Sequence, residues 1–198
     1  MMAIAAADIG ATNVGLCLWN GAFRVLSVTL PGADDDEDNY ALEARRLGEW
    51  RDFFWNWLVA EKVERLAVEL PLRSDVGRRN DDDTWAPATS MSTIFRAYNN
   101  VGAAIEIAHR LNIPFEMVAV SRWRGAFLGV HRAPPTVKPK DRRKWWKAQV
   151  RKECARLGIV TRNDDQGDAA GIAWWFRQKL RLEGVGSRAG DLFEKAIA

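Results

Sequence analysis

Apolar residues in the first 30 positions fall into three short runs separated by turn residues. The runs cover residues 3–8, 14–19 and 22–30, and Asn20-Gly21 stands between the second and the third. An Asn-Gly pair between two apolar runs is a strong hairpin signal, because both residues tolerate the positive φ of a tight turn. The pattern predicts a three-stranded antiparallel meander at the start of the chain.

Helical and strand-like patterns alternate along the rest of the chain. Apolar residues recur at three- and four-residue steps in the helical segments, whereas the strand segments are short apolar runs bounded by turn residues. The predicted elements are a helix at 40–62, a strand at 64–69, a helix at 91–111, a strand at 115–120, and helices at 121–129, 141–157 and 164–182.

This order of elements predicts an α/β fold with a mixed five-stranded sheet, in which two parallel strands follow the meander and helices flank the sheet. Residues 1–198 are expected to form a single domain, since the length suits one hydrophobic core. Within it, residues 71–90 are expected to form a long loop and residues 131–140 a basic, Pro-rich linker. The acidic run at 33–38 is expected to be a solvated loop, because consecutive like charges repel and rarely converge on one ion.

Charge is distributed unevenly along the chain. The first 100 residues carry 10 basic and 16 acidic side chains, and the last 98 carry 19 basic and 10 acidic ones. A basic half indicates a polyanionic partner such as nucleic acid, with an ordinary solvated surface as the alternative. The sequence contains neither an 18-residue apolar run nor a signal-peptide pattern, and Cys17 and Cys154 are far apart. We therefore expect no membrane span, and free thiols in a reducing cytoplasm.

The basic residues are concentrated between positions 138 and 156. On a helix such a run forms a phosphate-binding face and makes binding depend steeply on salt, although a solvated amphipathic helix is the alternative. Trp145 and Trp146 inside this segment are expected either to pack in the core or to stack on an unpaired base. The residues predicted to contact DNA are Lys138, Lys140, Arg142, Arg143, Lys144, Lys147 and Arg151.

Acidic residues lie at positions where a bound cation would explain them. Asp8 and Glu69 end predicted strands, where a buried acid is costly unless its charge is compensated. Asp165 and Asp168 lie three residues apart and face the same side of the last helix. Asp164 could serve in place of Asp165, but capping of the helix is the ordinary role of an acid at that point. Carboxylates suit Mg²⁺, and two such ions can activate water and stabilise the leaving oxygen of a phosphodiester.

Four segments resemble motifs of the RuvC-type Holliday junction resolvases, which belong to the RNase H-like nuclease superfamily. Residues 7–15 (ADIGATNVG) resemble the opening motif of that family, and residues 66–69 (LAVE) resemble its second motif. Residues 147–150 (KAQV) resemble its Lys-x-Gln-Val segment, and residues 165–169 (DQGDA) resemble its final pair of aspartates. The four segments occur in the family's order and span nearly the whole chain.

The resemblance implies an RNase H-like fold, a homodimer, and Mg²⁺-dependent nicking of four-way DNA junctions at two symmetric points, with Mn²⁺ as a substitute metal. It implies that Asp8, Glu69, Asp165 and Asp168 are metal ligands and that Lys147 lies near the scissile phosphate. Aromatic residues on the first and last long helices are then candidates for the dimer interface. These candidates are Trp50, Phe54, Trp57, Trp174 and Trp175.

The chain departs from the family in four places, two of which are the Pro-rich linker before the basic helix and an extension past the last predicted helix. The other two follow Glu69. The segment 71–90 is longer and more acidic than the family leads us to expect, and Leu70-Pro71 follows Glu69 where the family has an aromatic residue. These departures bear on junction specificity, and they favour a phage-encoded relative. Three alternatives remain: an RNase H-like nuclease acting on flaps or RNA–DNA hybrids, a non-catalytic junction-binding protein, and a fragment of an actin-like ATPase or sugar kinase, whose first phosphate motif residues 8–13 also resemble.

Overall fold

The computed structural model describes residues 2–31, 39–71, 77–79, 85–87 and 90–197, with side chains described for 2–31, 40–71 and 90–183. The acidic run at 33–38 lies outside these residues.

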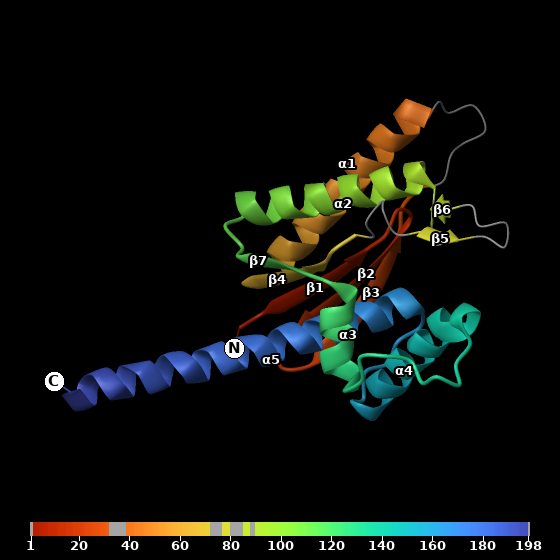
Figure 1. Ribbon diagram of the computed structural model, residues 1–198. Coiled ribbons are helices and arrows are strands. Elements are labelled where there is room, and N and C mark those ends of the chain that lie inside the picture. The colour runs from red at the N-terminus through yellow and green to blue at the C-terminus, as the bar shows by residue number, and fades with distance from the viewer. Residues whose placement is uncertain (1, 32–38, 72–76, 80–84, 88–89, 198) are drawn as a thin grey trace.

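A mixed five-stranded sheet forms the centre of the molecule (Figure 1). Its strands are β1 (Ile4–Ile9), β2 (Asn13–Trp19), β3 (Phe23–Thr29), β4 (Arg65–Glu69) and β7 (Phe115–Val118). They lie in the order β3-β2-β1-β4-β7, with β1, β2 and β3 antiparallel and β4 parallel to both β1 and β7. The predicted meander with two further parallel strands is confirmed.

Helices cover both faces of the sheet, with α1 and α2 on one face and α3, α4 and α5 on the other (Figure 1). Their bounds are α1 (Asn39–Ala60), α2 (Met91–Arg110), α3 (Val120–Leu128), α4 (Arg142–Arg156) and α5 (Asp164–Ile197). The predicted helices agree with these within a few residues, except that α5 continues well past residue 182 and extends beyond the sheet.

The two segments expected to be irregular each contain a short element. Within 71–90, β5 (Gly77–Arg79) and β6 (Trp85–Pro87) pair as a small antiparallel sheet. Within 131–140, the chain is irregular until a 3₁₀ turn, η1 (Pro139–Asp141), leads directly into α4.

Side-chain size differs between the two faces of the sheet and sets how closely the helices approach. The face under α5 carries small residues such as Ala6, Cys17 and Ala67, and α5 meets them with Ala169 and Ala173. Small residues on both surfaces let a helix lie close to a sheet at native packing density. Side chains alternate along a strand, so Asp8 shares this face with Ala6, and Glu69 shares it with Ala67. Both acids therefore lie under α5.

Gly15 sets the position of the first turn of α5. It pairs with Asp8 across β1 and β2, and directly paired residues of antiparallel strands share a face. A Cβ atom on Gly15 would lie 2.0 Å from the backbone oxygen of Asp165, so the backbone of α5 occupies the space that any side chain would need. The absence of that side chain brings Asp165 beside Asp8.

Polar contacts hold the start of α5 against β3. The Asn163 side chain caps the helix by accepting a hydrogen bond from the backbone N–H of Gln166 (2.9 Å). The Gln166 side chain in turn accepts from the backbone N–H of Arg162 (2.8 Å). Both side-chain amides also donate to Ser27 Oγ on β3, at 3.0 and 3.2 Å. The acids of the first turn are therefore held in a fixed position above the sheet.

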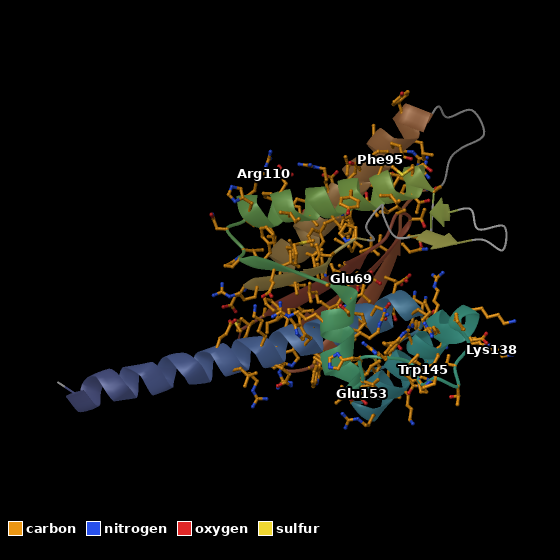
Figure 2. All side chains as sticks on the ribbon, in the orientation of Figure 1. Glu69, Phe95, Arg110, Lys138, Trp145 and Glu153 are labelled. Carbon is orange, nitrogen blue, oxygen red and sulfur yellow. The ribbon has the colours of Figure 1, made fainter. Side chains whose placement is uncertain are left out.

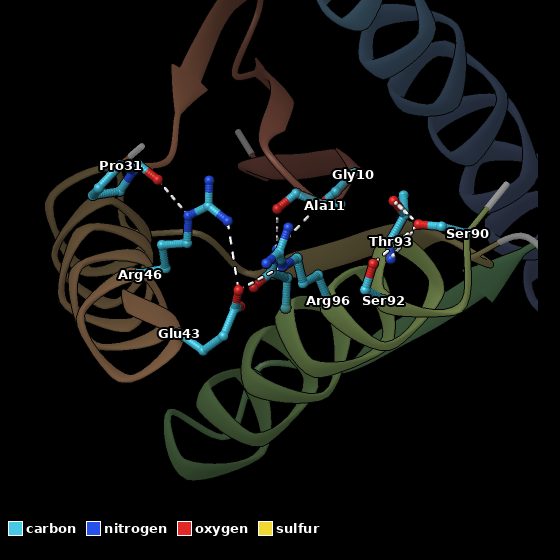
Figure 3. A network of polar contacts seen from close by, with 10 residues as sticks. Gly10, Ala11, Pro31, Glu43, Arg46, Ser90, Ser92, Thr93 and Arg96 are labelled. Carbon is cyan, nitrogen blue, oxygen red and sulfur yellow. Dashed lines mark hydrogen bonds and ion pairs between the residues drawn. The ribbon is translucent and has the colours of Figure 1, made fainter. Parts of the chain in front are cut away.

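On the opposite face, a polar network ties α1 and α2 to the turn that follows β1 (Figure 3). The Asn100 amide donates to the backbone oxygens of Gly10 (3.0 Å) and Ala11 (3.4 Å). Glu43 joins Arg46 of α1 to Arg96 of α2. Because the turn begins two residues after Asp8, this network also supports the end of β1.

Most aromatic residues predicted as interface candidates are instead core residues. Trp50 and Phe54 are fully buried, Trp57 and Trp175 nearly so, and the Trp50 indole donates to the backbone oxygen of Asn100 (2.9 Å). The prediction that these four residues form a dimer interface is wrong, because α1 and α5 bury their large rings against the sheet and neighbouring helices. Trp174 is only partly buried.

Replacement of Gly15 by Ala is expected to lower the free energy of unfolding by about 3 kcal/mol, because the new methyl group clashes with backbone rather than with a flexible side chain. Chemical denaturation measures this change. Gly48→Ala in α1 is the matched control, since no heavy atom lies within 4 Å of the position that its methyl group would take, and it should stabilise the protein by about 0.5–1 kcal/mol. Equal stability of the two variants would contradict the close approach of α5.

Candidate active site

Three carboxylates from three different elements meet at one end of the sheet. Asp8 belongs to β1, Glu69 ends β4, and Asp168 lies in the second turn of α5. Burial raises the pKa of Asp8 well above its usual range, and the negative charges of Glu69, Asp168 and Asp165 raise it further. These electrostatic effects show that the predicted acids share one neighbourhood.

Glu69 is held by an indole that sequence reasoning missed. Trp123 of α3 is fully buried and donates from Nε1 to Glu69 Oε2 at 2.6 Å. Burial raises the pKa of Glu69 to about 7; the Trp123 hydrogen bond and the nearby Arg124 oppose this rise, whereas Asp168 adds to it. The hydrogen bond therefore fixes the orientation of the Glu69 carboxylate.

Asp168 faces two cations. Burial raises its pKa to about 6, while Arg124 and Lys147 lower it and Asp164 and Asp165 raise it again. Arg124 Nη2 lies 3.8 Å from Asp168 Oδ2. The Arg124 guanidinium also lies over the rings of Trp123 (5.1 Å) and Trp146 (5.7 Å), contacts that hold a cation in place.

The structure distinguishes Asp164 from Asp165. Asp164 points toward α4, where it pairs with Lys147 Nζ (2.7 Å) and Arg151 Nη1 (3.2 Å). Both aspartates raise the pKa of Asp168, but only the charge of Asp165 also raises the pKa of Asp8. Asp165 therefore lies near Asp8, and Asp164 links α5 to the basic helix.

The predicted basic residues gather beside the acids. Lys140, Arg143, Lys144, Lys147 and Arg151 line a cavity of about 350 Å³ together with Asp164. Arg143 also lines a second cavity, of about 320 Å³, whose wall includes Asp8 and Glu69. We call this second space the acid cavity. Lys138 and Arg142 are exposed on the same segment.

Three residues of the site have no strong signal in the sequence. Trp123 and Arg124 sit in a short helix whose apolar spacing predicts only packing, and Gly15 has the pattern of an ordinary strand residue. Counting the register back from the predicted hairpin could have placed Gly15 opposite Asp8. The contact of Trp123 with Glu69 joins residues 54 positions apart and had no local signal.

The carboxylate set fits a hard divalent cation in its chemistry. Its donors are oxygens, without thiol or imidazole, and burial with mutual repulsion is the condition that a dication would relieve. Among the residues that the structure describes, no three His, Cys, Asp or Glu side chains converge as tightly as a complete metal-ligand set. Binding of an ion would therefore require the carboxylates to turn toward it.

The raised pKa values predict that the free energy of unfolding depends on pH. An acid whose pKa is higher in the folded state binds more protons there, so its stabilising effect is complete below its ordinary pKa and is lost as pH rises through the folded value. For Asp168 this window runs from about pH 4 to about pH 6. In EDTA, the free energy of unfolding of Asp168→Asn, relative to that of the unchanged protein, should therefore rise by about 2–3 kcal/mol from pH 4 to pH 8.

Chemical denaturation at several pH values measures that gain. Added Mg²⁺ should stabilise the unchanged protein at pH 8 and have little effect at pH 4, because protons then neutralise the acids. Asp52→Asn on the exposed surface of α1 is the control, because it removes a carboxyl that the fold does not bury. A gain that is absent, or of the opposite sign, would show that Asp168 is not held in a charge-repelling site.

Comparison with known proteins gives a match in structure but not in sequence. No protein-family model matches the chain, and no curated protein matches its sequence. Within the described residues, no helix is both long and apolar enough to span a membrane.

Solved structures of Holliday junction resolvases match over almost the whole chain. RuvC of T. thermophilus in complex with a Holliday junction substrate aligns with a TM-score of 0.62 and 20% identity, covering 92% of this chain and 97% of RuvC. Another structure of Thermus thermophilus RuvC aligns with a TM-score of 0.61 and 18% identity, again covering 92% of this chain and 97% of RuvC. The yeast mitochondrial Holliday junction resolvase Ydc2 aligns with a TM-score of 0.50 and 14% identity, covering 96% of this chain and 83% of Ydc2. The predicted RNase H-like fold, as in RuvC, is confirmed; at this identity the likeness shows the fold alone.

Proposed function

We propose that the chain is a metal-dependent endonuclease that nicks four-way or other branched DNA junctions by phosphodiester hydrolysis. The proposal rests on one observation: the carboxyl groups of Asp8, Glu69 and Asp168 lie together, shielded from solvent, beside a basic helix. Buried like charges are costly to hold together without a compensating cation. An RNase H-like fold with this acid set and an adjacent basic surface suits cleavage of a polyanionic backbone.

Asp8, Glu69, Asp165 and Asp168 would hold Mg²⁺, or Mn²⁺ in its place. When bound, the metal supplies a nucleophilic water at neutral pH and positive charge at the leaving oxygen. Trp123 keeps Glu69 in one orientation through its 2.6 Å hydrogen bond. Lys147, whose charge lowers the pKa values of Asp8 and Asp168, is placed to stabilise negative charge on the scissile phosphate.

The basic residues of α4 and η1 would hold the flanking phosphates. Arg143 lines both the acid cavity and the cavity of about 350 Å³ beside Lys147 and Arg151, so a strand that it binds would pass directly over the carboxylates. The junction-bound T. thermophilus RuvC, which shares this fold, supports a four-way junction as substrate. Flaps and RNA–DNA hybrids are alternatives with the same chemistry. The buried free thiols of Cys17 and Cys154 suit the reducing cytoplasm, where we place the activity.

We further propose that two copies of the chain act together. Symmetric nicking of a four-way junction needs two active sites, and each chain provides one set of acids. Met91 and Phe95 lie one turn apart on α2 and are 50% and 60% exposed, so together they form an apolar stripe on the surface. This stripe on α2, rather than the tryptophans of α1, is the candidate interface.

A nicking assay on a synthetic mobile four-way junction tests the proposed function. Paired symmetric nicks are expected with Mg²⁺ and not with EDTA. Asp168→Asn should abolish cleavage while changing junction affinity by less than about tenfold, since the basic surface dominates binding. The double reversal Arg143→Glu with Lys144→Glu should instead weaken binding and flatten its salt dependence.

Linear duplex, a flap and an RNA–DNA hybrid serve as comparison substrates in the same assay. Cleavage of flaps or hybrids in preference to the junction would keep the chemistry and change the substrate. Undiminished cleavage by Asp168→Asn would remove Asp168 from the metal site. Tight junction binding with no cleavage of any substrate would indicate a binding protein instead.

Sedimentation equilibrium tests the proposed dimer. The unchanged protein should be dimeric at micromolar concentration, and Phe95→Glu should be monomeric because it buries a charge in an apolar contact. Val160→Glu is the control, since Val160 is 82% exposed and lies in the loop between α4 and α5, on the other side of the sheet from α2. An unchanged protein that sediments as a monomer at all concentrations would contradict the proposal.

A further inference from the structure

A large cavity lies next to the acids without containing any of them. It has a volume of about 580 Å³, within the range of pockets that bind small organic groups. Its wall comes from the end of β4, from α2, from the start of α3, and from α4 with the loop before it. The residues that matter below are Leu70, Tyr98, Ser121, Arg124, His131 and Trp146.

The position of this cavity follows from the topology. Leu70 and Pro71, which directly follow Glu69, line both this cavity and the acid cavity. The two spaces therefore adjoin at the carboxyl end of β4, between the helices of the two layers. In open α/β sheets, ligands bind outside the carboxyl ends of the strands. Figure 2 shows Glu69 at this edge, between α2 above and α4 below.

The cavity wall combines aromatic rings with a few polar groups. Tyr98 is 45% exposed and Leu70 is 44% exposed, so apolar surface faces the open space. The Trp146 ring is half-buried and carries the Arg124 guanidinium over it at 5.7 Å. The Ser121 hydroxyl and the His131 imidazole add a donor and an acceptor. Flat apolar surface with a few hydrogen-bonding groups is the chemistry that recognises a nucleobase.

His131 is seated by a specific packing feature. A Cβ atom on Gly125 would lie 2.3 Å from His131 Nδ1, so the imidazole lies directly against the backbone of α3. A side chain at position 125 would displace the ring. The polar edge of the cavity is therefore built into the fold.

We propose that this cavity, which we call the base pocket, receives one unpaired nucleobase of the DNA strand whose backbone lies across the acid cavity. The proposal rests on the proposed function and adds a recognition site to it. A base joined to a phosphate near Asp8 and Glu69 is the group that can reach across Leu70. Extraction of a paired base loses the free energy of its pairing and stacking, and contact with one aromatic wall recovers only part of it. The pocket therefore favours a base already unpaired, as at a branch point.

Fluorescence anisotropy with labelled four-way junctions tests this proposal. Each junction carries a single abasic nucleotide at one position within four nucleotides of the branch point. Binding is measured in EDTA, so the result does not depend on cleavage. One abasic position should weaken binding by the unchanged protein about tenfold, as expected for one stacked base.

Three variants locate that effect in the base pocket. Tyr98→Ala removes one wall of the pocket, and Val130→Trp fills its space. In both variants the same abasic position should weaken binding by less than about threefold, because the contact between base and pocket is already lost. Phe115→Ala removes a ring of similar exposure (39%) at the opposite end of β7, and the tenfold penalty should persist.

The outcomes separate this proposal from the nuclease activity. A penalty of equal size in Tyr98→Ala, Val130→Trp and the unchanged protein, or no penalty at any position, overturns the base pocket even if the protein nicks junctions. A penalty that disappears in both pocket variants supports the base pocket even if no substrate is cut. Loss of the penalty in Phe115→Ala as well would show a general effect on folding and would overturn the assignment.

Discussion

The close packing of α5 against the sheet is the constraint on which the rest of the site depends. Ala169 and Ala173 on the helix meet small residues on the strands, and Gly15 leaves room for the backbone of Asp165 itself. This approach brings Asp168 to the two acids that end β1 and β4. Any larger residue along the contact would lift the helix and separate the carboxylates. Here the packing of the core also determines the distance between the charged carboxylates.

Gathering those charges has an electrostatic cost that the surrounding residues only partly offset. Burial and mutual repulsion raise the pKa values of Asp8, Glu69 and Asp168, while Arg124 and Lys147 act in the opposite direction. The proposed metal would relieve the repulsion that remains. Asp164 is the exception among these acids, because its charge is paired with Lys147 and Arg151 and so joins α5 to the basic helix.

In the proposed function, the same few elements would serve both catalysis and base recognition at this edge of the sheet. Helix α3 supplies Trp123 to Glu69 and Arg124 to Asp168, and Arg124 continues outward over Trp146 to the wall of the base pocket. Helix α4 places Arg143 over the acid cavity and Trp146 beside the pocket. A strand bound by α4 would thus meet the proposed phosphate-binding, catalytic and base-binding surfaces within a short length of backbone.

The amino-acid sequence by itself determined the meander, the two parallel strands, the basic helix and the positions of Asp8, Glu69 and Asp168. These features depend on local periodicity or on residues at element ends, which neighbouring positions specify. Only the tertiary structure decided that Asp164 pairs with α4 while Asp165 lies near Asp8, that Trp123 holds Glu69, and that Trp50 and Trp57 of α1 are core. Those outcomes depend on which distant surfaces meet and how closely, and side-chain volume and helix approach fix that only once the whole fold has formed.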